Sequence, residues 1–235
     1  MISAARTHIG KVRASNQDAL LVLPGAFGVF GVADGMGGHK AGDVASKMAV
    51  SVVERALRDA RPSQDLLMAA IEEANLLIWE EQLDNPDYSG MGTTMTLIWE
   101  DRDRVLLGHV GDSRAYRVRQ GQIVQISQDH SMVAELVRQG MITQEEAAVH
   151  PYRNIITRAL GTADSIEVDV AEFDKRPGDL FLICSDGLSE YVKPARMLDI
   201  LRRDSLEKAA DILLSLALDG GGRDNISLVL AEVAP

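Results

Sequence analysis

The chain has 235 residues, of which 46% are hydrophobic and 25% are charged. These proportions are ordinary for a folded globular protein and exclude disorder for the bulk of the chain. Its 24 basic and 35 acidic residues give a net charge of −11, which disfavours a nucleic-acid-binding groove or an anionic membrane as a partner. The one cysteine, Cys184, excludes an intramolecular disulfide and a cysteine-rich zinc site, and its apolar neighbours predict a place in the core.

The N-terminal residues are polar and contain no apolar segment typical of a secretory signal. No apolar run elsewhere approaches the ~20 residues that a membrane-spanning helix needs. The sequence therefore predicts a cytoplasmic protein without a membrane span, and we expect a monomer.

Taken in chain order, the apolar pattern predicts strands and helices without regular alternation. Two strands joined by a Pro-Gly turn are followed by two helices separated by Pro62, at 19–23, 27–33, 41–60 and 63–83. Four short strands come next, at 93–99, 104–110, 114–118 and 122–126. Residues 131–149 are predicted to be helical, with a break at Gly140 and Thr143 as an N-cap. The remaining segments are two strands, two helices and a last strand, at 166–173, 179–184, 194–203, 205–218 and 226–233.

Runs of strands, then helices, then strands again predict an α+β fold. We expect a central β-sandwich of two mainly antiparallel sheets flanked by pairs of helices, because several strands are apolar on both faces. Residues 127–160 are predicted to be a helical insertion between sheet strands. No long linker or internal repeat is visible, so the sequence predicts one domain over residues 1–235.

Five aspartates lie at the ends of apolar strands, each beside Gly, Ser, Gln or Asn: Asp18, Asp34, Asp112, Asp186 and Asp224. Taken singly, each is most simply a turn residue, since Asp and Gly dominate turns for backbone reasons. If the strand ends converge, however, the carboxylates repel one another unless they are protonated or paired with cations. Oxygen ligands favour Mg²⁺ or Mn²⁺, so the set predicts a centre for one of these ions.

Eight motifs that include these aspartates occur in the order of one known family and span residues 6–233. They are Gly10–Arg13 with Asn16–Asp18, Ala33–His39, Gly92–Thr94, Gly111–Tyr116, Asp129–Ser131, Thr157–Gly161, Ser185–Leu188 and Gly222–Asn225. The chain resembles the metal-dependent protein phosphatases (type 2C Ser/Thr phosphatases), specifically their bacterial branch. An ordered set of eight motifs is a far more specific signal than any one of them.

The resemblance implies a catalytic domain that hydrolyses phosphoserine and phosphothreonine in proteins and reverses a bacterial Ser/Thr kinase. It implies two tightly bound Mn²⁺ or Mg²⁺ ions, with Asp34 bridging them, the Gly35 carbonyl on one, and Asp186 and Asp224 on the other. A hydroxide between the ions would attack phosphorus directly, without a phosphoenzyme. Three further roles are implied by the resemblance: phosphate binding by Arg13, retention of bound waters by Asp18, and a third, weaker ion on Asp112 and Asp186.

Two positions depart from the pattern of many relatives. Gln17 stands where they have Glu, which predicts looser retention of one metal or its waters. Met36 stands where many eukaryotic relatives have a histidine that is the proposed general acid, and Met cannot donate a proton. His39 is then the nearby substitute acid, although it could equally order its loop through a hydrogen bond.

Other classes of function fit the sequence less well or stay open. The Gly-rich stretch 35–42 fits neither a P-loop nor the dinucleotide fingerprint, and Gly111–Ala115 lacks the last glycine of a serine-hydrolase nucleophile elbow. A hydrolase of small phosphoesters stays open, because the same centre would serve it. A phosphoprotein-binding pseudophosphatase also stays open, although a pure binder has no need for so many carboxylates.

Overall fold

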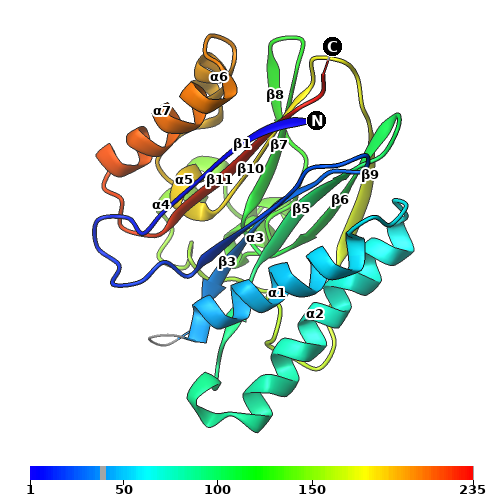
Figure 1. Cartoon of the computed structure of the whole chain (residues 1–235). Coiled ribbons are helices and arrows are strands. Elements are labelled where there is room, and N and C mark those ends of the chain that lie inside the picture. Colours follow the sequence, from blue (N-terminus) through cyan, green and yellow to red (C-terminus); the bar gives the residue numbers. More distant parts are fainter. Residues whose placement is uncertain (38–40, 235) are drawn as a thin grey trace.

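A computed structural model describes residues 1–37 and 41–234, which form two antiparallel β-sheets packed face to face (Figure 1). The first sheet contains, in spatial order, β1 (Ile2–His8), β11 (Ile226–Glu232), β10 (Leu180–Cys184), β7 (Arg114–Arg119) and β8 (Gln122–Gln125). The second contains β2 (Asp18–Leu23), β3 (Val29–Met36), β5 (Met95–Glu100), β6 (Arg104–Val110) and β9 (Asp169–Asp174), and the short β4 (Gly92–Thr93) pairs with β3. The predicted α+β fold with two antiparallel sheets is confirmed.

A hydrophobic layer lies between the two sheets. Phe30 and Ile98 of the second sheet pack in the same buried cluster as Phe181 and Val229 of the first. A strand covered on both faces has no polar face, which explains why every residue of β5 is buried and why the central strands lack alternation. Cys184 is fully buried, as predicted.

Each outer face of the sandwich is covered by a pair of helices. The second sheet carries α1 (Ala41–Leu57) and α2 (Gln64–Asp84), and the first carries α6 (Pro194–Leu201) and α7 (Leu206–Asp219), as Figure 1 shows. Ser63 caps α2 by accepting a hydrogen bond from Leu66 N–H, as its position before the helix predicts. Two shorter helices are η1 (Pro86–Tyr88) and α5 (Asp186–Ser189).

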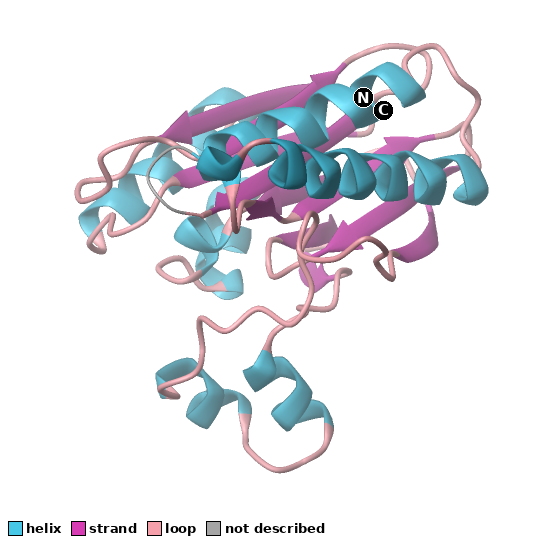
Figure 2. Ribbon diagram, turned by 90° about the horizontal axis from the view of Figure 1, so that it is seen from below, coloured by secondary structure: helices cyan, strands magenta, loops and turns pink. Residues whose placement is uncertain are grey.

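The segment between β8 and β9 contains two short helices, α3 (Met132–Arg138) and α4 (Gln144–Val149). The backbone turns at Gly140 with φ +69°, and Thr143 forms a capping box with Glu146 at the start of α4. In Figure 2 this pair of short helices lies apart from the sheets, joined to them by extended loops. The expected break and N-cap are therefore both present.

The sequence pattern did not predict β1, and it placed the start of β9 three residues early. β1 pairs with β11 along its whole length, but Ala4 is its only buried residue, so its sequence lacks an apolar run. As an edge strand it is specified by pairing more than by burial. Among the described residues, no helix is long and apolar enough to cross a membrane.

Candidate metal centre

Two neighbouring strands bring the first pair of aspartates together. β2 and β3 are antiparallel, and their register places Asp18 directly opposite Asp34. β10 leads into Asp186, the first residue of α5, and Asp224 stands just before β11, the neighbour of β10. The predicted convergence of strand ends is therefore a property of the sheet topology.

The backbone at Asp34 is held by two threonines, Thr93 at the end of β4 and Thr94 directly after it. Asp34 N–H donates to Thr94 Oγ1 at 2.9 Å, and the Asp34 carbonyl accepts from Thr93 Oγ1 at 2.9 Å. The next residue must be glycine, because a Cβ at Gly35 would lie 2.1 Å from the Gly42 carbonyl oxygen. These contacts fix the backbone that carries the Asp34 side chain and the Gly35 carbonyl, the two groups expected to share an ion.

Asn225 organises the loop that carries Arg13. Its side-chain oxygen accepts from Gln17 N–H at 2.8 Å, and its amide nitrogen donates to the carbonyls of Ile9 and Ser15 at 2.9 and 3.0 Å. One buried side chain thus ties three points of residues 9–17 to the start of β11. A single amide can do this because it offers an acceptor and two donors.

These elements enclose a pocket of about 480 Å³ at one end of the sandwich. The sandwich side of its lining includes six residues that the sequence predicted, namely Arg13, Asp34, Gly35, Asp112, Asp186 and Asp224. Asp18 does not line the pocket but is buried, with Ser185 Oγ donating to its Oδ2 at 2.9 Å. His39 lies outside the described residues.

Arg13 lies at the pocket beside one of the aspartates. Its Nη2 donates to Asp224 Oδ2 at 2.6 Å, and this hydrogen bond raises the pKa of the guanidinium further above its ordinary value. The Arg13 side chain is half exposed, so it can leave Asp224 for another anion in the pocket without crossing the core. Its position fits the expected contact with a phosphate.

Burial is the main cause that raises the pKa values of the aspartates. It raises the pKa of Asp18 to about 7 and that of Asp112 to about 7, with repulsion by Asp186 adding to both. The pKa of Asp186 rises to about 6, again through burial and then through the charge of Asp224. Burial, followed by the charges of the four other carboxylates around it, raises the pKa of Asp34 well above its ordinary value. The group is thus poorly tolerated as free anions, and cations would relieve the repulsion.

The donor atoms fit hard divalent ions. Asp18 Oδ1 and Asp186 Oδ1 are buried and have no hydrogen-bond partner among the described residues. Within the part of the chain that the structure describes, no three Asp, Glu, His or Cys side chains form a group able to hold an ion by themselves. Ions here would therefore take their remaining ligands from the Gly35 carbonyl and from water, as Mg²⁺ and Mn²⁺ readily do.

The other wall of the pocket contains residues of the Thr157–Gly161 motif, to which the sequence assigns no role. It comes from the end of the segment between α4 and β9 and consists of Asn154, Ile156, Thr157, Arg158, Ala159 and Thr162. Thr94 and Asn225 were likewise visible only as motif members. Their roles depend on backbone groups distant in sequence, so only their presence beside strand-end aspartates could have pointed to them.

A family model described as "Protein phosphatase 2C" matches residues 6–216. The serine/threonine protein phosphatase PstP of Mycobacterium tuberculosis is 43% identical over 98% of this chain, which spans only 44% of the length of that relative. The serine/threonine phosphatase stp of Listeria welshimeri is 39% identical over 97% of this chain and 94% of its own length.

Solved structures show the same likeness. A crystal structure of the M. tuberculosis phosphatase PstP/Ppp superposes with a TM-score of 0.93 at 40% identity, covering 100% of this chain and 99% of that one. The catalytic domain of PstP in complex with two manganese ions superposes with a TM-score of 0.90 at 39% identity, covering 100% of this chain and 98% of that one.

Proposed function

Because the chain belongs to the protein phosphatase 2C family, we propose that it is a metal-dependent phosphatase that hydrolyses phosphoserine and phosphothreonine in proteins. The observation that carries this proposal is the set of five aspartates that meet next to Arg13 at one end of the sandwich, each either buried or lining the pocket. Concentrated carboxylates with an adjacent guanidinium suit metal-assisted chemistry on a phosphate.

We assign two tightly held Mn²⁺ or Mg²⁺ ions to this pocket. Asp34 would bridge them, the Gly35 carbonyl would bind one, and Asp186 and Asp224 would bind the other. Asp18, buried behind Asp34 with a free Oδ1, would hold metal-bound waters, and Asp112 with Asp186 would hold a third, weaker ion. When bound, two such ions acidify water to a nucleophile at neutral pH and neutralise phosphoryl oxygens.

The residues of the chain then bind and orient the substrate. Arg13 would exchange its contact with Asp224 for two oxygens of the phosphate, a geometry for which a guanidinium is suited and an ammonium is not. A cysteinyl-phosphate intermediate is disfavoured, because Cys184 is fully buried and burial raises its thiol pKa to about 12. His39 remains the predicted donor of a proton to the leaving oxygen.

The biological setting is proposed from the relatives. These relatives are bacterial proteins named serine/threonine phosphatases, which supports phosphorylated proteins as substrates and a Ser/Thr kinase as the opposing enzyme. We propose that residues 1–235 act in the cytoplasm as one monomeric catalytic domain. In this view the 127–160 segment is a flap. Its returning arm, the part after α4 that contains Asn154 and Thr157, forms one wall of the pocket.

Side-by-side rates test the substrate class. Phosphothreonine and phosphoserine peptides and a small aryl phosphate are given to the protein with Mn²⁺ and with EDTA, and the Asp34→Asn variant serves as the matched control. A protein phosphatase gives a higher kcat/KM for the peptides, only with Mn²⁺. Preference for the small ester would favour the phosphoester hydrolase, and tight peptide binding without turnover would favour the pseudophosphatase.

A further inference from the structure

His130 is a buried histidine next to the pocket that has no part in the centre described above. It lies between β8 and α3 and is 3% exposed. Its backbone N–H donates to the Gly111 carbonyl at 2.7 Å, and its ring Nδ1 accepts from Gly111 N–H at 3.1 Å. Backbone and side chain together therefore hold both peptide groups of the residue directly before Asp112.

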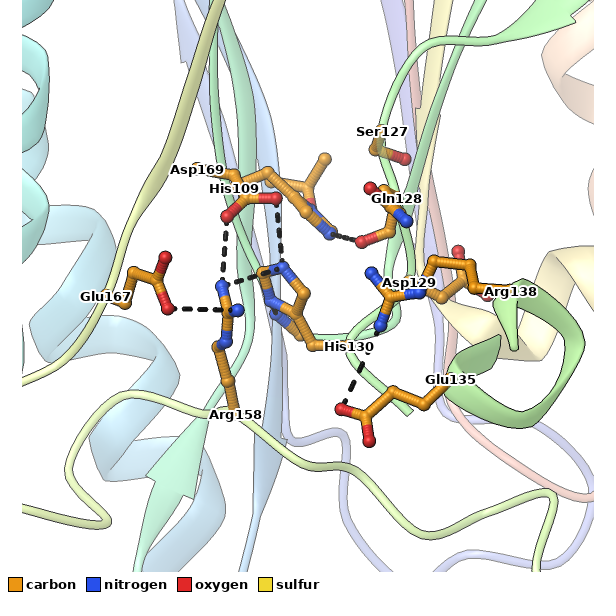
Figure 3. A network of polar contacts seen from close by, with 12 residues as sticks. His109, Ser127, Gln128, Asp129, His130, Glu135, Arg138, Arg158, Glu167 and Asp169 are labelled. Atoms are coloured by element: carbon orange, nitrogen blue, oxygen red, sulfur yellow. Dashed lines mark hydrogen bonds and ion pairs between the residues drawn. The ribbon is translucent and has the colours of Figure 1, made fainter. Parts of the chain in front are cut away.

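The hydrogen bonds of the two ring nitrogens together define the tautomer of His130. Since Nδ1 accepts a hydrogen bond, the neutral ring carries its proton on Nε2, which donates to Asp169 Oδ2 at 3.1 Å (Figure 3). The second oxygen of Asp169 accepts from Arg158 Nη1 at 3.0 Å. Burial lowers the pKa of His130 and thereby favours the neutral ring that this arrangement needs.

The same histidine also contacts the opposite wall of the pocket. The His130 carbonyl accepts a hydrogen bond from Thr157 N–H at 2.8 Å. Thr157 lines the pocket together with Arg158, which donates to Asp169, the carboxylate that the His130 ring contacts. Figure 3 shows His130 between Arg158 and Asp169 on one side and the segment that leads into α3 on the other. His130 is thus the point where the turn before Asp112 meets the returning arm of the 127–160 segment.

The turn itself has little freedom on its other side. Gly111 adopts φ +112°, and a Cβ there would lie 2.5 Å from Thr94 Cγ2. Ser113 Oγ lies 2.8 Å from Thr94 Oγ1, which also accepts from Asp34 N–H. Thr94 therefore holds the Gly111–Ser113 turn on the side of Asp34, and the His130 ring holds it through the Gly111 N–H.

We propose that His130 is a positioning residue whose ring, oriented by Asp169, holds the Gly111–Asp112 turn in the conformation that lets Asp112 bind a divalent cation. The proposal rests on the assignment of Asp112 as a ligand in the proposed function. It also makes the Asp112 site sensitive to the pocket wall, because Arg158 holds the carboxylate that orients the ring.

Two substitutions at one position separate the two contacts of the ring. His130→Asn keeps an acceptor near the place of Nδ1 but cannot reach Asp169, whereas His130→Gln can reach Asp169 but offers no acceptor to Gly111. His150→Gln is the matched control, because His150 Nδ1 also accepts a backbone N–H, that of Tyr152, on the protein surface. Asp112→Ala marks which Mn²⁺ binding step belongs to Asp112.

Two readouts independent of turnover are measured on each variant. The first is the hydrogen-exchange rate of the Gly111 amide in metal-free protein, and the second is a calorimetric titration with Mn²⁺. In His130→Gln we expect Gly111 to exchange about five- to tenfold faster and the weakest Mn²⁺ step to weaken by a similar factor, as for the loss of one buried hydrogen bond. His130→Asn keeps an acceptor for Gly111 but loses the orienting contact with Asp169, so we expect a smaller loss in both values, about two- to threefold, and His150→Gln should change neither.

The outcomes are distinct. The proposal is overturned if His130→Gln shows wild-type exchange of the Gly111 amide and wild-type Mn²⁺ binding. It is also overturned if the Gln and Asn variants lose Mn²⁺ affinity equally while the Gly111 amide exchanges at the wild-type rate. If Asp112→Ala leaves every Mn²⁺ step unchanged, the assignment of Asp112 in the proposed function is wrong. That failure differs from a failure of His130, in which Asp112→Ala removes a step that His130→Gln leaves intact.

Discussion

Asp34 is the residue on which the centre depends most, because its carboxylate is surrounded by those of Asp18, Asp112, Asp186 and Asp224. Asp34→Asn keeps the shape of the side chain and removes one charge from the proposed bridge between two ions. We expect kcat to fall by at least ~10³, comparable to the loss of a key electrostatic stabiliser, with the fold retained. Steady-state kinetics at saturating Mn²⁺ and a circular dichroism spectrum check this, and near-normal turnover would remove Asp34 as the bridge.

Arg13 should act on binding more than on the chemical step. If its contact with phosphate is equally strong in the ground and transition states, Arg13→Ala raises KM for a phosphopeptide about tenfold and leaves kcat nearly unchanged. Arg13→Lys, which keeps the charge but not the planar fork, is the matched control and should recover only part of the loss. Unchanged KM and kcat in Arg13→Ala would show that this side chain does not touch the substrate.

At the residue scale, the sequence predicted the acids better than their supports. The aspartates stand beside Gly, Ser, Gln or Asn at strand ends, which is a local signal, and the ordered motifs supplied the roles expected for them. Asn225 and Thr94 carry no such signal, since each acts on backbone groups of segments far away in the chain. A one-dimensional pattern does not show which distant carbonyl an amide will meet.

The sequence predicted the strands whose residues are mostly buried. β3, β5, β10 and β11 are nearly all buried and appear as apolar runs. β1 was missed because pairing with β11, rather than burial, makes it a strand. The short α5 was missed as well, since four residues are too few for a helical period to show.

His109 in β6 gives the sheet a predictable response to acid. It is fully buried, its Nε2 lies 3.0 Å from the Gln128 carbonyl, and burial, followed by the charge of His130, lowers its pKa to about 4. A histidine whose pKa is depressed in the folded state stabilises the protein above the unfolded pKa of about 6.5, and this stability is lost as pH falls toward 4. Protonation of His109 should therefore lower the free energy of unfolding by about 3 kcal/mol between pH 7 and 4.

Urea unfolding between pH 7 and 4 checks this for the wild type beside His109→Gln. The variant is expected to be less stable at pH 7, because a buried contact changes, but to lose less stability on acidification. His150→Gln, on the surface, should follow the wild-type slope. Identical pH slopes for the wild type and His109→Gln would show that His109 does not titrate on unfolding.

At the scale of the whole molecule, the sandwich brings together carboxylates that repel one another, and metal should stabilise the fold. A ligand that binds only the native state adds ~2.7 kcal/mol at a hundredfold excess over Kd, and here it also removes repulsion around Asp34. We expect the melting temperature to rise by several degrees on adding Mn²⁺ to EDTA-treated protein, and to rise much less in Asp34→Asn. An equal rise in both proteins would place the stabilising ion elsewhere.

The two-sheet architecture was predictable from element order and from strands without a polar face, whereas the packing of the 127–160 segment was not. Its helices were visible from Gly140 and Thr143, but the contact of its returning arm with the pocket depends on the backbone pairing of Thr157 with His130. Such pairing leaves no periodic trace in the sequence.

The most direct test of the central claim is phosphate release from a phosphothreonine peptide by EDTA-treated protein into which Mn²⁺ is titrated back. We expect no turnover without metal, saturable recovery with Mn²⁺, and recovery lowered by at least ~10³ in Asp34→Asn at every Mn²⁺ concentration. Full turnover in excess EDTA, or equal recovery in the wild type and Asp34→Asn, would contradict it.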